Sequence, residues 1–387
     1  MSLDKTIREN LEGNYLTIHV ENFEEGVEYA AKIKIQQILL IGTLTNENVI
    51  DFNAFNKLSK SLRIISFIQD VGNVINLESI YNLKELREIT FQDKQKFELD
   101  ISRFPKLEHF GGEYWKGLIN IGKAYTLTSM VIRKYPYPDL ENVSNLRNLE
   151  ILHIYSSKIQ SLSGVERLSI RELCLARNNK LEDIHQINEV SSLESLQIEG
   201  CKRLENFSVL KGNTHIEDLF IDKLDSIDFV ESMPHLKKIN FWNCKDGNMA
   251  PLLKSQSLEV VNFYPNKKHY THTLKEIEEI AGDKIYLVGG EDISSSQTEL
   301  HNVVAGLLIE NELTISIAES LTGGRLTSMV VDKSGISSWL LEGRVCYSNK
   351  SKVSALGVKE ETLEKYGEGS EQTAKEMVQG IAKRLNS

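Results

Sequence analysis

The sequence predicts an α/β protein of two parts, a repeat solenoid followed by a small α/β domain. Three observations support this prediction. A pattern of apolar residues recurs every 20 to 23 residues through most of the chain. The pattern fades after Leu274, and Gly and Ser residues then gather in the segment 289–298. Beyond that segment, short apolar runs alternate with stretches of helical periodicity, which is typical of an α/β unit.

The repeat has the form apolar-x-x-apolar-x-apolar. Its alternating second half predicts a short strand with one buried face, after which the chain crosses back to begin the next unit. One unit cannot bury its apolar face alone, so stacked units must share a continuous core. Nine copies open at Leu86, Leu107, Leu127, Leu149, Ile170, Leu193, Ile216, Leu236 and Leu258, and two looser copies open at Ile35 and Leu62.

In three copies, the residue eight positions after the start has a small polar side chain. It is Asn178, Cys201 or Cys244. Together with the repeat, this position resembles the Asn/Cys ladder of leucine-rich repeat proteins, and the segment 146–165 resembles their short, internalin-like class. The resemblance implies parallel strands on a concave side and short turns or 3₁₀ segments on the convex side. At a buried ladder position, a free Cys is expected to act as a small packing residue.

The chain is expected to divide into four segments. These are an N-terminal cap (1–30), the leucine-rich repeat solenoid (31–288), a linker (289–298) and the α/β domain (299–387). The cap contains N-F-E-E-G-V-E-Y-A-A-K-I and is predicted to be helical, since such arrays need a cover over the open end of the core. The run K-I-Y-L-V (284–288) predicts one last strand.

The x positions of the repeat are expected to point to the concave face. Aromatic side chains exposed there would be the usual anchors of a protein interface, so we expect a protein partner on this face. The alternative is that the rings lean along the sheet and cover neighbouring apolar positions. The four aromatic residues are Tyr155, Phe220, Trp242 and Tyr264.

Composition narrows the classes of partner. The net charge is -10, from 45 Lys and Arg against 55 Asp and Glu, and no long basic run favours nucleic acid or an anionic membrane. No apolar run approaches the length of a membrane span, and the N-terminal residues lack the apolar core of a signal peptide. The four Cys residues form no C-x-x-C pair, so we expect a cytoplasmic protein without zinc or a disulfide framework.

The α/β domain is expected to begin with a helix and to contain two strands. Asn349 follows the second strand at a position suited to an N-cap. The expected helices span 299–311, 350–356, 359–366 and 370–385, with a further helix starting at the Gly pair 323–324; the expected strands span 314–318 and 343–348.

Four motifs occur in order in this domain: A-E-S-L-T-G-G-R-L, G-R-V-C-Y-S-N-K-S-K, L-G-V-K-E-E-T-L-E-K-Y-G and S-E-Q-T-A-K-E-M. Together they resemble the CinA C-terminal family of competence/damage-inducible-type proteins, whose members include nicotinamide-nucleotide amidases. The resemblance implies hydrolysis of the carboxamide of nicotinamide mononucleotide, with release of ammonia and without metal or cofactor. It assigns the nucleophile to Ser320, assisted by Tyr347 and Lys352. Substrate contacts are expected from Thr322, Gly323, Gly324 and Asn349.

The residue types fit that chemistry. Ser320 would stand between a strand and a helix, where free N–H groups and the helix dipole favour developing negative charge. Its hydroxyl needs a base, and a desolvated Lys can supply one. The alternative is a capped helix start with Lys352 as a solvated surface residue. Glu319 is either a second polar site residue or a charge that complements the helix dipole, and Cys346 is expected to pack.

The sequence also departs from the family pattern. The family continues with a second half that opens with a strand and a T-G-I-A-G-P-type loop, which this sequence lacks, and Leu321 and Gly367–Ser370 depart locally. We therefore expect a partial domain whose sheet edge needs a cover. Three functions stay open: a protein-interaction module carrying this partial domain, an active amidase, or a nucleotide-binding sensor without catalysis. The sequence leaves the oligomeric state open.

Overall fold

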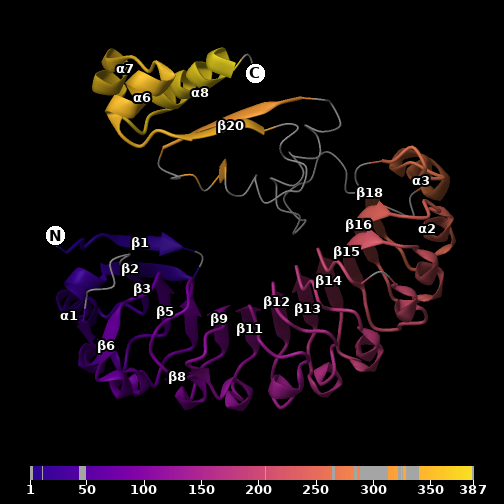
Figure 1. The fold of residues 1–387 in the computed structure, drawn as a ribbon, viewed down its shortest axis with the longest axis horizontal. Helices are drawn as coiled ribbons and strands as arrows, with labels where there is room; N and C mark the ends of the chain where they lie inside the picture. The colour runs from indigo at the N-terminus through magenta and orange to yellow at the C-terminus, as the bar shows by residue number, and fades with distance from the viewer. Residues whose placement is uncertain are drawn as a thin grey trace. The chain divides into compact units, whose positions relative to one another are not determined.

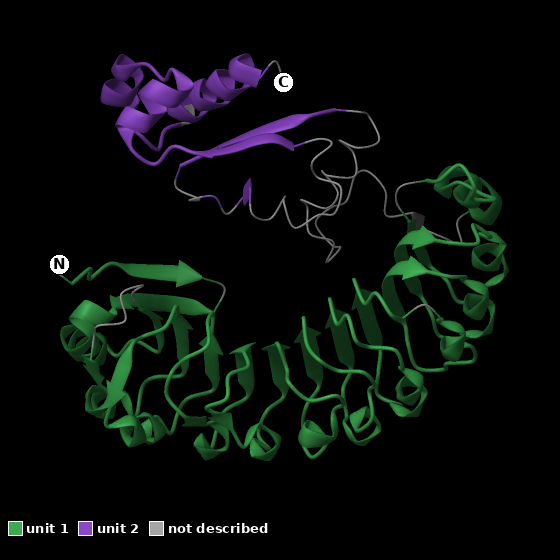
Figure 2. Cartoon of the chain, in the orientation of Figure 1, with its two compact units in different colours: residues 1–287 green, residues 288–387 purple. Residues whose placement is uncertain are grey.

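The structure is a computed structural model with two compact units, residues 1–287 and 288–387 (Figure 2). It describes residues 3–10, 12–42, 49–204, 206–263, 266–282, 286–287, 313–320, 324, 326–327 and 340–385.

The first unit is built on one sheet of fourteen described strands, of which the outermost, β1, is antiparallel and the rest are parallel. Each predicted copy of the repeat forms a strand that begins two residues after its first apolar residue, so the predicted repeat solenoid is confirmed. The strands are β1 (Ile7–Asn10), β2 (Gly13–His19), β3 (Gln37–Ile41), β5 (Ile64–Ile68), β7 (Glu88–Phe91), β9 (His109–Glu113), β11 (Ser129–Arg133), β12 (Ile151–Tyr155), β13 (Glu172–Ala176), β14 (Ser195–Glu199), β15 (Asp218–Leu224), β16 (Lys238–Cys244), β17 (Val260–Phe263) and β18 (Tyr286–Leu287).

Short helical turns carry the chain back between strands, and Figure 1 shows them on the side of the solenoid opposite the sheet. They are mostly 3₁₀ segments, as the resemblance implied. They comprise η1 (Val20–Asn22), α1 (Phe23–Ile33), η2 (Phe52–Leu58), η3 (Leu77–Asn82), η4 (Ile101–Arg103), η5 (Ile121–Lys123), η6 (Glu141–Val143), η7 (Val165–Arg167), η8 (His185–Glu189), η9 (Ser208–Leu210), η10 (Asp228–Ser232), α2 (Ala250–Lys254) and α3 (Leu274–Ala281). Two short parallel pairs join β4 (Val49–Asp51) to β6 (Asn73–Ile75) and β8 (Leu99–Asp100) to β10 (Leu118–Ile119).

The N-terminal thirty residues differ from the helical cap that the sequence predicted. The segment N-F-E-E-G-V-E-Y-A-A-K-I forms the predicted helix, α1, but the residues before it form the hairpin β1–β2. Leu16 and Ile18 of β2 are fully buried and continue the inner face of the sheet. β2 forms because its backbone pairs with β3 on one side and with β1 on the other. The outer strand of this hairpin, β1, lies along the edge of the parallel sheet.

A ladder of hydrogen bonds joins consecutive repeats. Asn178 is fully buried, and its Oδ1 accepts a hydrogen bond from the Ser157 N–H at 2.9 Å. Its Nδ2 donates to the Ile154 carbonyl at 2.8 Å. One repeat earlier, the Tyr135 N–H donates to Ser157 Oγ at 2.9 Å. The ladder side chains therefore supply partners to buried backbone groups that leave the strand.

The cysteines at ladder positions pack as predicted. Cys201 and Cys244 are buried, and the Cys201 thiol donates to the Leu175 carbonyl at 3.5 Å. Burial raises the pKa of each of these thiols to about 12, so both stay protonated at neutral pH.

In the described part of the second unit, two strands pair in parallel, β19 (Ile315–Glu319) and β20 (Leu340–Val345), and three helices follow β20. The helices are α6 (Asn349–Leu356), α7 (Glu360–Tyr366) and α8 (Glu371–Leu385), each within one residue of its predicted bounds. Their core consists of Cys346, Leu356, Val358, Leu363, Met377 and Ile381. The packing role expected for Cys346 is thus confirmed.

Two details of this unit differ from the sequence predictions. The second strand begins and ends three residues earlier than predicted, because its pairing stops where β19 ends, at Glu319 opposite Val345. The N-cap of α6 is Ser348, whose Oγ accepts a hydrogen bond from the Ser351 N–H at 3.1 Å, and Asn349 is the first helical residue. The predicted linker 289–298 and helix 299–311 lie outside the described residues.

The close approach of α8 to α6 depends on Gly380. A Cβ added at this position would lie 1.8 Å from the Leu356 carbonyl oxygen. A backbone atom cannot move aside as a flexible side chain can, so the two helices would have to separate.

The Asn178 ladder gives the first prediction. Asn178→Ala should lower the free energy of unfolding of the solenoid by about 2–3 kcal/mol, because it leaves the Ser157 N–H and the Ile154 carbonyl buried without partners. Urea unfolding followed by tryptophan fluorescence measures this. The exposed neighbour Asn179→Ala is the matched control and should change stability by less than about 0.5 kcal/mol. Equal losses in both variants would contradict the ladder role.

Gly380 gives the second prediction. Gly380→Ala should destabilise the α6–α8 packing by about 1–3 kcal/mol, despite the higher helix propensity of Ala. Hydrogen–deuterium exchange of peptides from α6 and α8 should accelerate. Gly369→Ala is the control, since a Cβ there meets no atom within 4 Å. Unchanged exchange in Gly380→Ala would show that the helices do not need this close approach.

Candidate functional site

The carboxyl ends of β19 and β20 bring the predicted catalytic residues to one edge of the second unit. The strands are parallel, and the Cys346 N–H donates to the Glu319 carbonyl at 2.7 Å just beyond the last paired residues. Ser320 follows β19 directly and is partly exposed, and Tyr347 follows the end of β20. Ligand sites in parallel sheets commonly form outside such carboxyl ends.

Lys352 is the most unusual side chain at this edge, because it is only 1% exposed. It lies in the first turns of α6, and its Nζ donates to the main-chain carbonyl of Tyr347 at 3.1 Å. An ammonium group has three N–H donors and is costly to bury without acceptors. The sequence-based alternative that Lys352 is a solvated surface residue is therefore wrong.

The side chains of the other predicted site residues form no described contact with Lys352. The Tyr347 side chain is 66% exposed, so its link to Lys352 runs through the backbone and not through the phenol. Among the residues that the structure describes, no hydrogen bond joins the Ser320 hydroxyl to Lys352 or Tyr347. Asn349 is exposed in the first turn of α6, and Gly324 has a positive φ of 94°. Thr322 and Gly323 lie outside the described residues.

Glu319, for which the sequence left two roles open, is 2% exposed. Its carboxylate accepts hydrogen bonds from the N–H of Leu326 at 2.9 Å and of Thr327 at 2.7 Å, and from the Thr327 hydroxyl. Residues 326–327 are helical, so Glu319 holds N–H groups there. Gly343 leaves room for this packing, since a Cβ there would lie 2.2 Å from Thr327 Cγ2.

On the concave face of the solenoid, two of the predicted aromatic residues form a pair. The rings of Phe220 on β15 and Trp242 on β16 meet edge to face, with centroids 5.2 Å apart. Both side chains are half-buried, as is Tyr155 on β12. Tyr264 lies outside the described residues.

A polar cluster surrounds Tyr155, and the sequence reasoning missed two of its members, Glu172 and Cys174. His153 Nε2 lies 2.6 Å from Glu172 Oε1, and the Cys174 thiol lies 3.7 Å from the Tyr155 hydroxyl. Burial raises the pKa of Cys174 to about 11, so this thiol is not a nucleophile at neutral pH. The x positions of the copy that opens at Ile170 are Glu172 and Cys174, and that signal could have found them.

Within the part of the chain that the structure describes, no group of three or more His, Cys, Asp or Glu side chains is arranged to hold a metal ion. No helix there is long and apolar enough to cross a membrane. The four cysteines are all buried and form no disulfide.

The fold and these strand ends define a leucine-rich repeat solenoid followed by an α/β unit. A comparison with protein families identifies the second part. Residues 297–387 match the CinA C-terminal domain, so the chain carries a domain of this family behind its solenoid.

Curated relatives match about a third of the chain. A putative competence-damage inducible protein of Clostridioides difficile is 46% identical over 126 residues, which are 32% of this chain and 30% of that protein. A protein of the same description from Alkaliphilus oremlandii is 52% identical over 117 residues, or 27% of its length. The chain thus spans less than a third of the length of these curated relatives.

Two solved structures each resemble part of the chain. A competence/damage-inducible protein from Agrobacterium tumefaciens is 35% identical over 23% of this chain and 54% of that chain, with a TM-score of 0.23. An internalin from Listeria monocytogenes covers 70% of this chain and 89% of that chain at 13% identity, with a TM-score of 0.43.

Proposed function

We propose that the solenoid is a protein-interaction module that binds its partner on the concave face through the aromatic patch Tyr155, Phe220 and Trp242. The observation that carries this proposal is the half-buried edge-to-face pair of Phe220 and Trp242 on neighbouring strands. Aromatic side chains held rigidly on a sheet lose little conformational entropy on binding and bury a large area.

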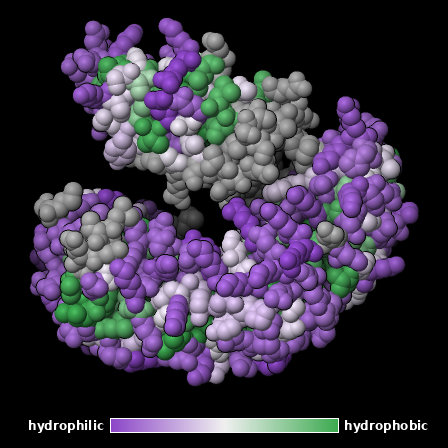
Figure 3. All heavy atoms as spheres, in the orientation of Figure 1, coloured by the Kyte–Doolittle hydropathy of each residue, from purple (hydrophilic) through white to green (hydrophobic). Residues whose placement is uncertain are grey.

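The surroundings of Phe220 favour this role over simple packing. Its neighbours in register on β14 and β16 are Gln197 and Asn240. The ring therefore has polar side chains beside it along this row of the sheet and covers no apolar neighbour there. In Figure 3, hydrophilic residues make up most of the visible face of the solenoid. An aromatic pair in polar surroundings is the arrangement expected of an interface anchor.

A second candidate function rests on the second unit, where the buried amino group of Lys352 donates to the carbonyl of Tyr347, and the nearby Cys346 N–H donates to the carbonyl of Glu319, the residue before Ser320. We propose that this domain is a nicotinamide mononucleotide amidohydrolase that uses Ser320 as nucleophile and Lys352 as base, with Tyr347 assisting. The neutral form of a desolvated Lys is the form that can accept a proton.

The proposed reaction balances in two steps. Ser320 Oγ bonds to the carboxamide carbon while its proton passes to Lys352, and the C–N bond then breaks as that proton leaves with ammonia. Water next attacks the ester, releasing the nicotinic acid nucleotide and restoring the Ser320 hydroxyl. A nucleotide sensor would use the same edge for binding without either step.

The aromatic patch gives the third prediction. Affinity purification with the full chain should enrich a specific partner, and Phe220→Ala and Trp242→Ala should each weaken its binding at least tenfold, as expected of a hot spot. Tyr125→Ala is the matched aromatic control, since this Tyr is 56% exposed and lies between strands. The proposal fails if all three variants retain the same proteins as the natural chain.

The strand edge gives the fourth prediction. The full chain should release ammonia from nicotinamide mononucleotide, and Ser320→Ala should lower kcat at least 100-fold, while exposed Ser354→Ala should leave it unchanged. Calorimetry with the same nucleotide runs alongside. Binding without ammonia release would support the sensor instead, and neither binding nor release would exclude both functions for this unit.

A further inference from the structure

A row of amide side chains crosses the concave face at the aromatic patch. Gln197, Phe220, Asn240 and Asn262 are paired in register on the consecutive strands β14, β15, β16 and β17. Phe220 thus has an amide on each side. The Trp242 ring that contacts Phe220 lies two residues beyond Asn240 on β16. Side chains two residues apart on a strand share one face of the sheet, so the amides and both rings belong to one surface.

Asn240 is the exception among the buried amide side chains. In the part of the chain that the structure describes, five Asn and Gln side chains are buried. Four of them, Gln95, Asn178, Gln186 and Asn213, form hydrogen bonds through their amides. Asn240 is 8% exposed, and its amide forms no hydrogen bond with any described residue. Buried polar groups almost always have a partner, so this amide is suited to one that comes from outside the chain.

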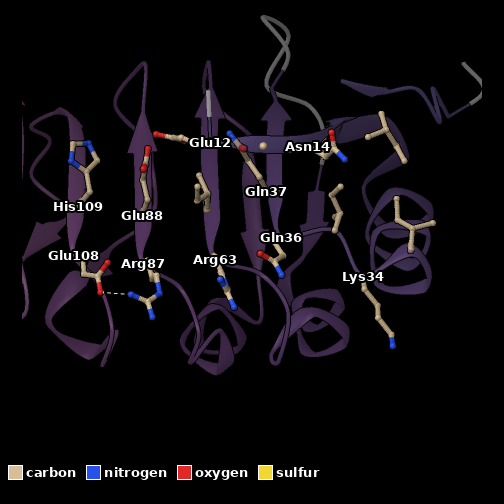
Figure 4. A pocket seen from close by; sticks show the side chains of 15 residues that line it. Glu12, Asn14, Lys34, Gln36, Gln37, Arg63, Arg87, Glu88, Glu108 and His109 are labelled. Atoms are coloured by element: carbon tan, nitrogen blue, oxygen red, sulfur yellow. Dashed lines mark hydrogen bonds and ion pairs between the residues drawn. The ribbon is translucent and has the colours of Figure 1, made fainter. Parts of the chain in front are cut away.

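The amide of Asn240 is open to a ligand. In the described ranges, the buried side-chain atoms that lack a partner and are closed to solvent do not include either amide atom of Asn240. Gln37 is different. It lies in the wall of the pocket at the N-terminal end of the solenoid (Figure 4), and its unpaired oxygen is enclosed by the protein. A ligand can therefore reach the amide of Asn240 but not the oxygen of Gln37.

Two acidic groups beside the row are already engaged. Asp218 and Lys238, which open β15 and β16, form an ion pair with 3.0 Å between Nζ and Oδ2. Asp222 accepts a hydrogen bond from the Gly200 N–H at 3.0 Å. The unpaired group in this row is therefore a neutral amide, which both donates and accepts hydrogen bonds and carries no net charge.

An extended peptide is complementary to this arrangement. The amide of Asn240 has a carbonyl acceptor and N–H donors in one plane, and a peptide group offers the matching donor and acceptor. The main-chain groups of a helix or a sheet are already bonded to one another, whereas those of an extended segment are free. The four strands of the row span about 14 Å at ~4.8 Å per strand, which is the length of roughly four extended residues.

We propose that the concave face binds an extended peptide segment of the protein partner. Asn240 bonds to the N–H and C=O groups of its main chain, and an apolar side chain of the segment packs against Phe220 and Trp242. This inference rests on the proposed function, because it names the part of the partner that the aromatic patch receives. The rings supply apolar contact area, and the amide fixes the register of the peptide. Gln197 and Asn262 lie on either side of this contact.

The test begins with a phage-displayed library of linear twelve-residue peptides, selected on the full chain. The most enriched peptide, synthesised with capped ends, should bind with a Kd below ~100 μM in fluorescence anisotropy. Asn240→Leu keeps the size of the side chain without its amide and should weaken binding at least tenfold. Asn179→Leu changes an exposed Asn and is the matched control, which should bind as the natural chain does.

Ester substitution tests the main-chain contact directly. Replacing each peptide bond of the ligand in turn by an ester removes one N–H donor with little change of shape. At one position this change should weaken binding to the natural chain at least fivefold. In Asn240→Leu the same ester should weaken binding less than twofold, because the hydrogen bond is already lost. Equal effects of every ester on both proteins would contradict the proposal.

The stability of the free protein gives an independent readout. Asn240→Leu should leave the urea midpoint of the full chain unchanged or raise it, because the amide has no partner to lose, unlike that of Asn178. A midpoint lowered as far as that of Asn178→Ala would show that the amide is already bonded within the protein, and the proposal would then be wrong.

Two further outcomes would overturn the inference. One is that no peptide is enriched, or that an oligosaccharide array alone gives binding that depends on Asn240. The other is a folded partner protein that requires Phe220 and Trp242 but binds Asn240→Leu as well as it binds the natural chain. That second result would leave the proposed interaction module intact and exclude only the extended peptide.

Discussion

The burial of each strand's apolar face against the next repeat is the interaction on which the rest of the solenoid depends. A single repeat has too little apolar surface to repay the entropy of ordering its chain, and only stacking provides a continuous core. The same stacking leaves strand-end N–H and C=O groups inside the protein. The side chains of Asn178 and Ser157 form hydrogen bonds with such backbone groups of the preceding repeat.

The stacked sheet fixes where function can lie. Because all its described strands but β1 are parallel and in register, side chains at the x positions form rows across the concave face. One such region is aromatic, at Phe220 and Trp242.

The arrangement of the second unit also depends on parallel strand pairing. Parallel pairing of β19 with β20 places Ser320 and Tyr347 at one edge, and α6 then returns Lys352 to that edge. Glu319 and Gly343 allow residues 326–327 to pack close to β19 and β20. The Tyr347 ring is largely exposed.

The sequence by itself determined the period, the strand positions and the CinA C-terminal resemblance, since these follow from local alternation and contiguous motifs. It could not separate a strand from a helix in the first thirty residues, where β2 forms because a sheet is present to receive Leu16 and Ile18. Nor could it show that Lys352 is buried, or that Glu319 holds the N–H groups of residues 326–327. Only the tertiary structure decided these points. Burial and charge proximity arise between segments far apart in the chain, and no local pattern records them.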